Sequence, residues 1–439
     1  MSRFRRSIPL LALFALIFSF RLFFGLWQAK WGEPDYIQTY LIGLKYYSTG
    51  EWPYFGPDVN GEENPAFQSQ IPGPLEGLLI GLPFHLLPIP EAPFVLLNLL
   101  NSAGLLLLAA YFHRRLPSLS MAWLALWLAS LPWTLHEGTN LINPAFVLFP
   151  GAIFFVGFME ATPFFSLHWL SKPWANAFMG FGLFTAMQFH FSYVYLGPLA
   201  LFAILAQMGR FRDFTVLRWF VLGALPPLAL VLPTYIRYGL GTNNVAGGFA
   251  ASFNWDNVRA FGTILARFLS LACYEMPRFL GLNRAARVDF LTGHPLLLVP
   301  GACLWVAGVV QPFLLLGCWF LKDEGRPQWR AAKWLILAVL LMVEVSFWFT
   351  IKKPFSHIYF ILLPFVAFYA AQCFSFVADR KPWRILAGTL VVFSLFFHLL
   401  YAPVFEPQYS IYPKREQVAQ AIDHKNYHLM GERRPGSLY

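Results

Sequence analysis

Charged residues are scarce in this chain of 439 residues. Asp, Glu, Lys and Arg together make up 12% of it, whereas a soluble domain usually carries about 25%. Hydrophobic residues make up 57%, and the mean hydropathy is +0.53. The missing solubilising surface excludes an ordinary soluble domain and favours a chain whose main solvent is the lipid bilayer.

Cysteine is also rare, and its spacing excludes two classes of site. The four cysteines show no CxxC pair, so neither a zinc site nor a disulfide framework is indicated; they are Cys273, Cys303, Cys318 and Cys373. No other run of residues has metal-ligand spacing, and we predict no metal site.

The net charge of +10 does not come with a basic stripe or a nucleic-acid-binding motif. Lys and Arg are dispersed among short loops between apolar segments, which is typical of residues that orient membrane spans. The sequence therefore excludes nucleic acid as a partner. Internal repeats, which are common in transporters, are not apparent either.

Long apolar segments are what the sequence does contain, and about 20 apolar residues suffice to cross a bilayer. Eleven segments are candidate spans: 8–29, 92–111, 119–136, 143–160, 175–191, 193–208, 214–236, 294–321, 333–351, 355–377 and 383–403. The first follows a basic N-terminus and lacks a small-residue cleavage site, which indicates an uncleaved signal anchor at 1–29. We predict an all-α polytopic membrane protein with about 11–13 transmembrane helices.

Basic clusters predict the orientation of these spans. If the clusters at 3–6, 113–115, 210–212, 322–333 and 379–384 are all cytoplasmic, residues 30–91 begin and end outside. The apolar segment 74–88 within them then does not span, and is re-entrant or interfacial; the alternative is a true twelfth span.

The same orientation divides the rest of the chain. Two further outer segments follow, 237–293 and the short tail 404–439, and they separate transmembrane bundles at 92–236 and 294–403. The run 258–272 in the second outer segment is expected to lie along the interface as an amphipathic helix.

One basic pair departs from the positive-inside pattern. Lys352 and Lys353 fall between two spans whose other ends are clearly basic, so the pair is expected outside. Snorkelling of the Lys stems at the interface is one explanation. The other is an anion such as a lipid phosphate, with His357 and Tyr359 as additional donors.

In the predicted first outer segment, residues 35–40 read DYIQTY and residues 50–53 read GEWP. These short motifs resemble those of the GT-C membrane glycosyltransferases, in the branch with protein O-mannosyltransferases and the aminoarabinose transferase of lipid A. That family opens its first outer loop with an Asp, followed by an aromatic residue and later by Gly-Asp-Trp. The proline-rich 70–75, QIPGPL, is similar to the family's approach to its next apolar segment.

A second group of motifs lies further along the chain. The family's Lys, His-Tyr and Pro pattern is similar to residues 353–364, and its polar residue before Pro is similar to Asn143-Pro144. Two departures from the family are that Asp35 is followed by Tyr36 instead of Glu, and that only about 35 residues follow the last span.

The resemblance implies a GT-C-like bundle with a long structured first outer loop. It also implies transfer of a hexose or pentose, with inversion, from a polyprenyl-phosphate donor to a glycan, lipid or protein acceptor on the outer face. Asp35 is the expected general base, with Glu33 as the alternative. The expected binding residues are Lys352, Lys353, His357, Tyr359, Arg21, Asn143 and Trp52. Some members of the family use a divalent metal. The expected location is the inner membrane of a bacterium, with the site facing the periplasm or exterior.

Two other functions fit the pattern of spans. A polytopic transporter or lipid flippase accounts for the intramembrane charges, including Arg21, but less well for the long outer loop beside the first span. A surface-polysaccharide ligase or polymerase also uses a lipid-linked donor, but typically places its long loop later in the chain.

Overall fold

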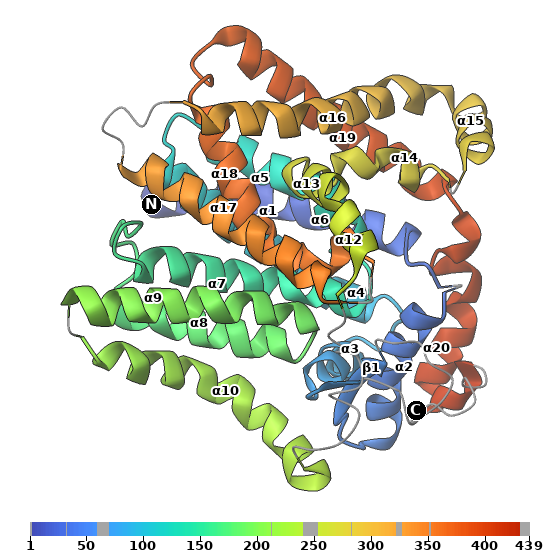
Figure 1. Ribbon diagram of the computed structural model, residues 1–439. Coiled ribbons are helices and arrows are strands. Elements are labelled where there is room, and N and C mark those ends of the chain that lie inside the picture. Colours follow the sequence, from blue (N-terminus) through green and yellow to red (C-terminus); the bar gives the residue numbers. More distant parts are fainter. Residues whose placement is uncertain are drawn as a thin grey trace. The chain divides into compact units, whose positions relative to one another are not determined.

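The computed structural model describes residues 2–31, 33–58, 70–211, 213–239, 253–281, 283–321, 327–350 and 353–430. Over these residues the chain is almost entirely α-helical (Figure 1). Nine of the described helices are long and apolar enough to cross a membrane, judged by length and composition. This agrees with the predicted all-α, multi-pass architecture, and the GT-C-like arrangement of the helices stays a prediction.

Two of the eleven expected spans form shorter helices. Segment 119–136 is divided into α5 (Met121–Ser130) and α6 (Pro132–His136), because Leu131 between them is extended, with ψ 134°. Proline disfavours the helical backbone conformation for the residue that precedes it. Segment 175–191 forms α8 (Lys172–Met187), whose 16 residues extend about 24 Å. The expected 11–13 long helices are therefore more than the nine found within the described ranges.

Contacts divide the chain into two compact units, each built from separate stretches. Unit 1 comprises Met1–Phe24, Ser102–Glu137 and Ser252–Phe405, and unit 2 comprises Gly25–Asn101, Gly138–Ala251 and Glu406–Tyr439. The two units are described separately below.

The regular structure of unit 1 is entirely helical over the residues that the structure describes. In chain order its elements are most of α1 (Ser2–Trp27), the second half of α4 (Ala92–Arg115), α5, α6, α12 (Trp255–Arg259), α13 (Phe261–Leu269), η4 (Cys273–Glu275), α14 (Met276–Phe279), α15 (Arg284–Gly293), η5 (Pro295–Leu297), α16 (Leu298–Trp319), α17 (Pro327–Trp348), η6 (Ser356–Leu362), α18 (Leu363–Ser375) and α19 (Lys381–Val404). Helix α16 packs against α19, and α17 against α18. The short α13 contacts both α16 and α18, so part of the predicted second outer segment lies against the long helices.

Unit 2 combines a helix-and-hairpin region with four longer helices. Its elements are α2 (Pro34–Thr49), β1 (Phe55–Asp58), β2 (Gln70–Pro72), α3 (Leu75–Leu86), the first half of α4, η2 (Asn143–Val147), α7 (Leu148–Ala161), α8, η3 (Phe191–Tyr195), α9 (Leu196–Phe211), α10 (Thr215–Tyr238), η7 (Pro407–Tyr409), η8 (Tyr412–Lys414), α20 (Arg415–Asp423) and η9 (Tyr427–Met430). Helix α8 packs against both α7 and α10, as the green part of Figure 1 shows.

The predicted first outer loop contains regular structure. Pro34 is the first residue of α2 and Gly50, in the left-handed region with φ 71°, ends it, which are the positions these residues favour. Strands β1 and β2 then pair antiparallel, with Phe55 opposite Pro72. Helix α2 packs against both α3 and β1.

The apolar segment 74–88 forms α3, which has only 12 residues. Its length of about 18 Å is well below the roughly 30 Å of a bilayer core. The re-entrant or interfacial course of α3 stays a prediction.

Candidate functional site

Asp35, the expected general base, lies in the first turn of α2 and is exposed. Glu33 is the residue that precedes the helix, and its side chain makes no capping hydrogen bond. Both carboxylates are accessible from outside the protein, as a base that receives a proton from a substrate must be.

Trp52 lies at the opposite end of α2 from Asp35. The helix runs from Pro34 to Thr49, which separates the two residues by about 20 Å along its axis. Trp52 is half-buried, and its indole Nε1 has no acceptor among the described residues. The spacing between Asp35 and Trp52 in the sequence therefore corresponds to the length of α2. The two side chains do not form one cluster.

Glu76 is a buried carboxyl that the sequence did not single out as a site. It lies in the first turn of α3, is 0% exposed, and neither of its oxygens accepts a bond from a residue that the structure describes. A methyl group at Gly56 of β1 would lie 3.1 Å from Oε2 of Glu76. Burial raises the pKa of Glu76 well above the usual range for a carboxyl, because desolvation disfavours the charged form.

In unit 1, two arginines of the predicted second outer segment reach the segment that begins at Lys353. Nη1 of Arg267 donates to the carbonyl oxygen of Pro354 at 2.6 Å. The guanidinium groups of Arg267 and Arg278 lie 6.0 and 5.0 Å from the centre of the Phe355 ring. The exposed Lys353 precedes Phe355 by two positions in the chain.

Two carboxylates hold this cationic segment in place. Glu275, which is 4% exposed, pairs through Oε1 with Nε of Arg267 at 2.9 Å and with Nη1 of Arg278 at 3.1 Å. Oγ of Ser356 donates to Oε1 of Glu137 at 3.3 Å. Arg267 is thereby committed to internal partners, whereas the side chain of Arg278 is 47% exposed. Arg278 and Lys353 are the groups that face outward.

His357 and Tyr359, the other expected donors of this segment, differ in exposure. The ring of His357 is half-buried and stacks on Phe355, with centroids 5.8 Å apart. Tyr359 is 0% exposed, and its ring lies against those of Trp133 and Phe268 at 5.6 and 5.9 Å. Because its ring is enclosed, we leave Tyr359 out of the phosphate site proposed below.

The remaining expected site residues lie elsewhere. Arg21 of α1 is fully buried in unit 1, and its Nη1 donates to the carbonyl oxygen of Thr134 at 3.0 Å, so it is enclosed by protein instead of snorkelling. Asn143 is half-buried at the start of η2 in unit 2. Lys352 lies outside the described residues.

The structure therefore sorts the expected residues into two groups. Lys353, His357 and Arg21 belong to unit 1, and Asp35, Glu33, Trp52 and Asn143 to unit 2. Within the ranges that the structure describes, no group of three or more His, Cys, Asp or Glu side chains could hold a metal ion.

The sequence did not distinguish Arg267 and Arg278 from four other arginines in the segment 237–293. Only the i, i+3 spacing of Glu275 and Arg278 could have suggested a local ion pair. The contact with Pro354 and Phe355 joins residues almost 90 positions apart, and no local pattern predicts it.

Comparisons of the chain with protein-family models, curated proteins and solved structures find no match.

Proposed function

We propose that the protein is a membrane glycosyltransferase that moves a sugar from a polyprenyl-phosphate donor to an acceptor on the outer face of the membrane. The observation that carries the proposal is the cationic segment of unit 1, in which the guanidinium groups of Arg267 and Arg278 lie against Phe355, two positions after the exposed Lys353. A lipid phosphate lies at the border of membrane and water, and this segment adjoins the apolar helix that begins with η6.

The leaving group determines what these cations do. When the bond between the anomeric carbon and the phosphate oxygen breaks, the bonding electrons stay with the phosphate and its negative charge increases. Guanidinium and ammonium groups at the phosphate stabilise that charge. Because Glu275 orients Arg267 and Arg278 in advance, little reorganisation is needed as the charge develops.

The acceptor requires a base. Its hydroxyl oxygen forms the new bond to the anomeric carbon from the face opposite the phosphate, which inverts the configuration, and its proton passes to a carboxylate. Asp35 is the proposed base because it is exposed in the first turn of α2, where a substrate hydroxyl can reach it. Positioned general bases contribute about 10²–10⁴-fold to a rate.

Purified protein in nanodiscs tests the proposal. Radiolabelled polyprenyl-phosphate hexoses and pentoses serve as donors, and a total cell-envelope extract serves as the acceptor. We expect one donor to release free polyprenyl phosphate while its label enters a product. Asp35→Asn is expected to lower that rate by about 10²–10⁴-fold. Glu51→Gln is the matched control, since Glu51 follows the other end of α2 and pairs with Lys45 at 2.8 Å.

The outcomes separate this enzyme from its alternatives. Full activity in Asp35→Asn, with Glu33→Gln inactive, would move the base to Glu33. Transfer that survives in both variants would remove the site assignment. A transporter or flippase would move a labelled lipid across liposomes without forming a covalent product.

A further inference from the structure

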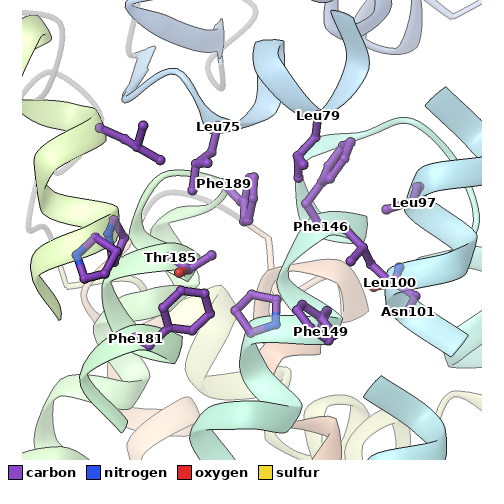
Figure 2. A pocket seen from close by; sticks show the side chains of 14 residues that line it. Leu75, Leu79, Leu97, Leu100, Asn101, Phe146, Phe149, Phe181, Thr185 and Phe189 are labelled. Carbon is purple, nitrogen blue, oxygen red and sulfur yellow. The ribbon is translucent and has the colours of Figure 1, made fainter. Parts of the chain in front are cut away.

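An apolar cavity lies within unit 2, between α3 and the longer helices. Its volume is about 260 Å³, and its walls come from α3, α4, η2, α7, α8 and α10 (Figure 2). Leu75 and Leu79 of α3 line it on one side, Phe181 of α8 lies on another (Figure 2), and Leu230 of α10 is also among the lining residues. Small-molecule pockets usually measure about 300–1,000 Å³, so this cavity is large enough for part of a hydrocarbon chain but small for a whole ligand.

Hydrocarbon is the chemistry that the walls favour. Apart from Asn101 and Thr185, the lining consists of Leu, Phe and Pro side chains. Water needs two to four polar partners in a cavity, and this lining offers no polar side chain besides these two. Helix α10, which contributes Pro226, Pro227 and Leu230, exposes apolar side chains on its other faces, including Leu225 at 49% and Leu232 at 54%. These faces are suited to lipid contact.

Two polar atoms in the lining make the cavity more selective. Nδ2 of Asn101 donates to the carbonyl oxygens of Gly138 and Ala145 at 2.8 and 2.9 Å, which orients Oδ1 as a remaining acceptor. Oδ1 of Asn101 and Oγ1 of Thr185 are buried, and no described residue bonds to either. The two side chains approach from different walls, α4 and α8 (Figure 2).

A buried acceptor without a donor is costly, at about 1–3 kcal/mol of desolvation, and a ligand with an N–H or O–H group offsets this cost. An isoprenoid chain has no polar atom along its length. An acyl chain attached through an amide, or bearing a hydroxyl, has such a group. The polar atoms of the cavity therefore favour an acyl lipid over the polyprenyl chain of a donor.

We propose that this cavity binds the amide-linked or hydroxylated acyl chain of a lipid, and that such a lipid is the acceptor of the transferred sugar. The second clause rests on the proposed function. Its structural support is that α3 carries Leu75 and Leu79 into the cavity while it also packs against α2, the helix that carries Asp35. One short helix thus connects the chain-binding cavity with the proposed base.

Photocrosslinking tests the cavity independently of any transfer. The protein in nanodiscs is irradiated with a ceramide that carries a diazirine in its amide-linked acyl chain, or with an isoprenoid phosphate of similar length that carries the same group. We expect the ceramide to label the cavity-facing residues of α3, α8 and α10 more strongly than the isoprenoid does. Stronger labelling by the isoprenoid, or labelling confined to lipid-facing residues, would overturn the proposal.

Variants on one helix sharpen the test. Leu79→Trp fills the cavity and is expected to lower the specific labelling at least about fivefold, since the chain loses its apolar contact. Leu82→Trp is the matched control, because Leu82 lies on the same helix, is 45% exposed and does not line the cavity. Thr185→Val keeps the side-chain shape and removes the hydroxyl, and it is expected to weaken ceramide labelling without weakening isoprenoid labelling. Equal labelling of all three variants would contradict the cavity assignment.

The transfer assay tests the acceptor. Label in an organic-extractable product, with a raised acceptor KM and an unchanged donor KM in Leu79→Trp, is the expected result. Label in protein or in water-soluble polysaccharide would overturn the acceptor assignment. If no donor supports transfer while ceramide still labels the cavity, the proposed function fails and the lipid site stands.

Discussion

At the scale of single residues, Arg278 is the most informative cation of the proposed phosphate site. Glu275 holds its Nη1 at 3.1 Å, and 47% of the side chain remains exposed. A charge-assisted hydrogen bond to phosphate contributes about 1.5–3 kcal/mol, so Arg278→Gln should raise the donor KM by about 10–100-fold. Initial rates over a range of donor concentrations would measure it.

The control for Arg278 comes from the same segment. Arg259 is 79% exposed and pairs with the exposed Asp256 at 3.5 Å, so Arg259→Gln should leave the donor KM unchanged. Arg278→Lys should recover part of the loss, because a point charge remains. An unchanged donor KM in Arg278→Gln would exclude the residue from the phosphate site.

The buried carboxyl of Glu76 should make the stability of the protein depend on pH. Because burial raises its pKa in the folded protein, the folded state keeps a proton that the unfolded state releases above about pH 4.3. Stability contributed by the neutral carboxyl is therefore complete below that pH and is lost as the pH rises toward the folded pKa. Glu76→Gln cannot ionise, so it should melt a few degrees higher than the parent at pH 8, by order of magnitude.

The pH dependence distinguishes this explanation from a general packing effect. The gain from Glu76→Gln should shrink as the pH is lowered from 8 to 5, measured by tryptophan fluorescence during heating. If the melting temperatures of the parent and of Glu76→Gln differ by the same amount over this range, Glu76 is not the group whose protonation in the folded state affects stability. Glu51→Gln, in an exposed ion pair with Lys45, should lack any such trend.

Some of these residues could be anticipated from the sequence and others could not. Asp35, Lys353 and His357 stand in short motifs, and the charge pattern drew attention to the Lys pair. Arg278 and Glu76 could not be singled out, because their surroundings depend on residues distant in the sequence. Glu76 is buried beside Gly56, and Arg278 contacts Phe355. Neither contact leaves a pattern in the local sequence.

At the scale of elements, close approach of α8 and α10 forms part of the wall of the cavity. An ideal Cβ at Gly223 of α10 would lie 2.0 Å from the carbonyl oxygen of Ala177, and one at Gly180 of α8 would lie 2.0 Å from that of Phe220. Small residues allow this approach between membrane helices. Since the obstructing atoms are backbone, even one methyl group must push the helices apart.

A matched pair of Gly→Ala changes tests this packing. Gly223→Ala should destabilise by about 1–3 kcal/mol through overpacking, and should lower ceramide labelling of the cavity. Gly197→Ala in α9 makes the same chemical change where nothing lies within 4 Å of the new methyl group. It should be neutral or stabilise by about 0.5–1 kcal/mol, because Ala favours a helix. Equal melting temperatures for the two variants would contradict the close contact.

Hydropathy predicted where helices lie more reliably than where they break. All eleven expected spans coincide with helical segments, but the extended Leu131 before Pro132 divides one of them. Averaging over a window of residues detects apolar composition and overlooks a single backbone break. The opposite error occurred in 30–91, where the moderately polar stretch Pro34–Thr49 is a helix. Its Pro start and Gly end were visible in the sequence, and they carried more information than its composition.

At the scale of the whole molecule, the orientation of the chain in the membrane underlies the proposed function, and it makes a prediction of its own. The positive-inside pattern places the end of α2 outside and the connection between α4 and α5 in the cytoplasm. Thr49 and Ser118 are exposed residues in these two places, so each can be replaced by cysteine without disturbing the core. A charged maleimide that cannot cross the bilayer should label Thr49→Cys in intact cells or spheroplasts and should spare Ser118→Cys.

Opening the membrane should reverse this difference, because the reagent then reaches Ser118→Cys as well. The parent protein is the background control: Cys273 and Cys373 are buried, and Cys303 and Cys318 are partly exposed within α16. Labelling of Ser118→Cys but not of Thr49→Cys in intact cells would invert the chain and place Asp35 in the cytoplasm, where an outer-face transfer could not occur. Labelling of both in intact cells would mean that an even number of crossings separates the two residues, so that either α4 does not cross the membrane or α3 crosses it as well.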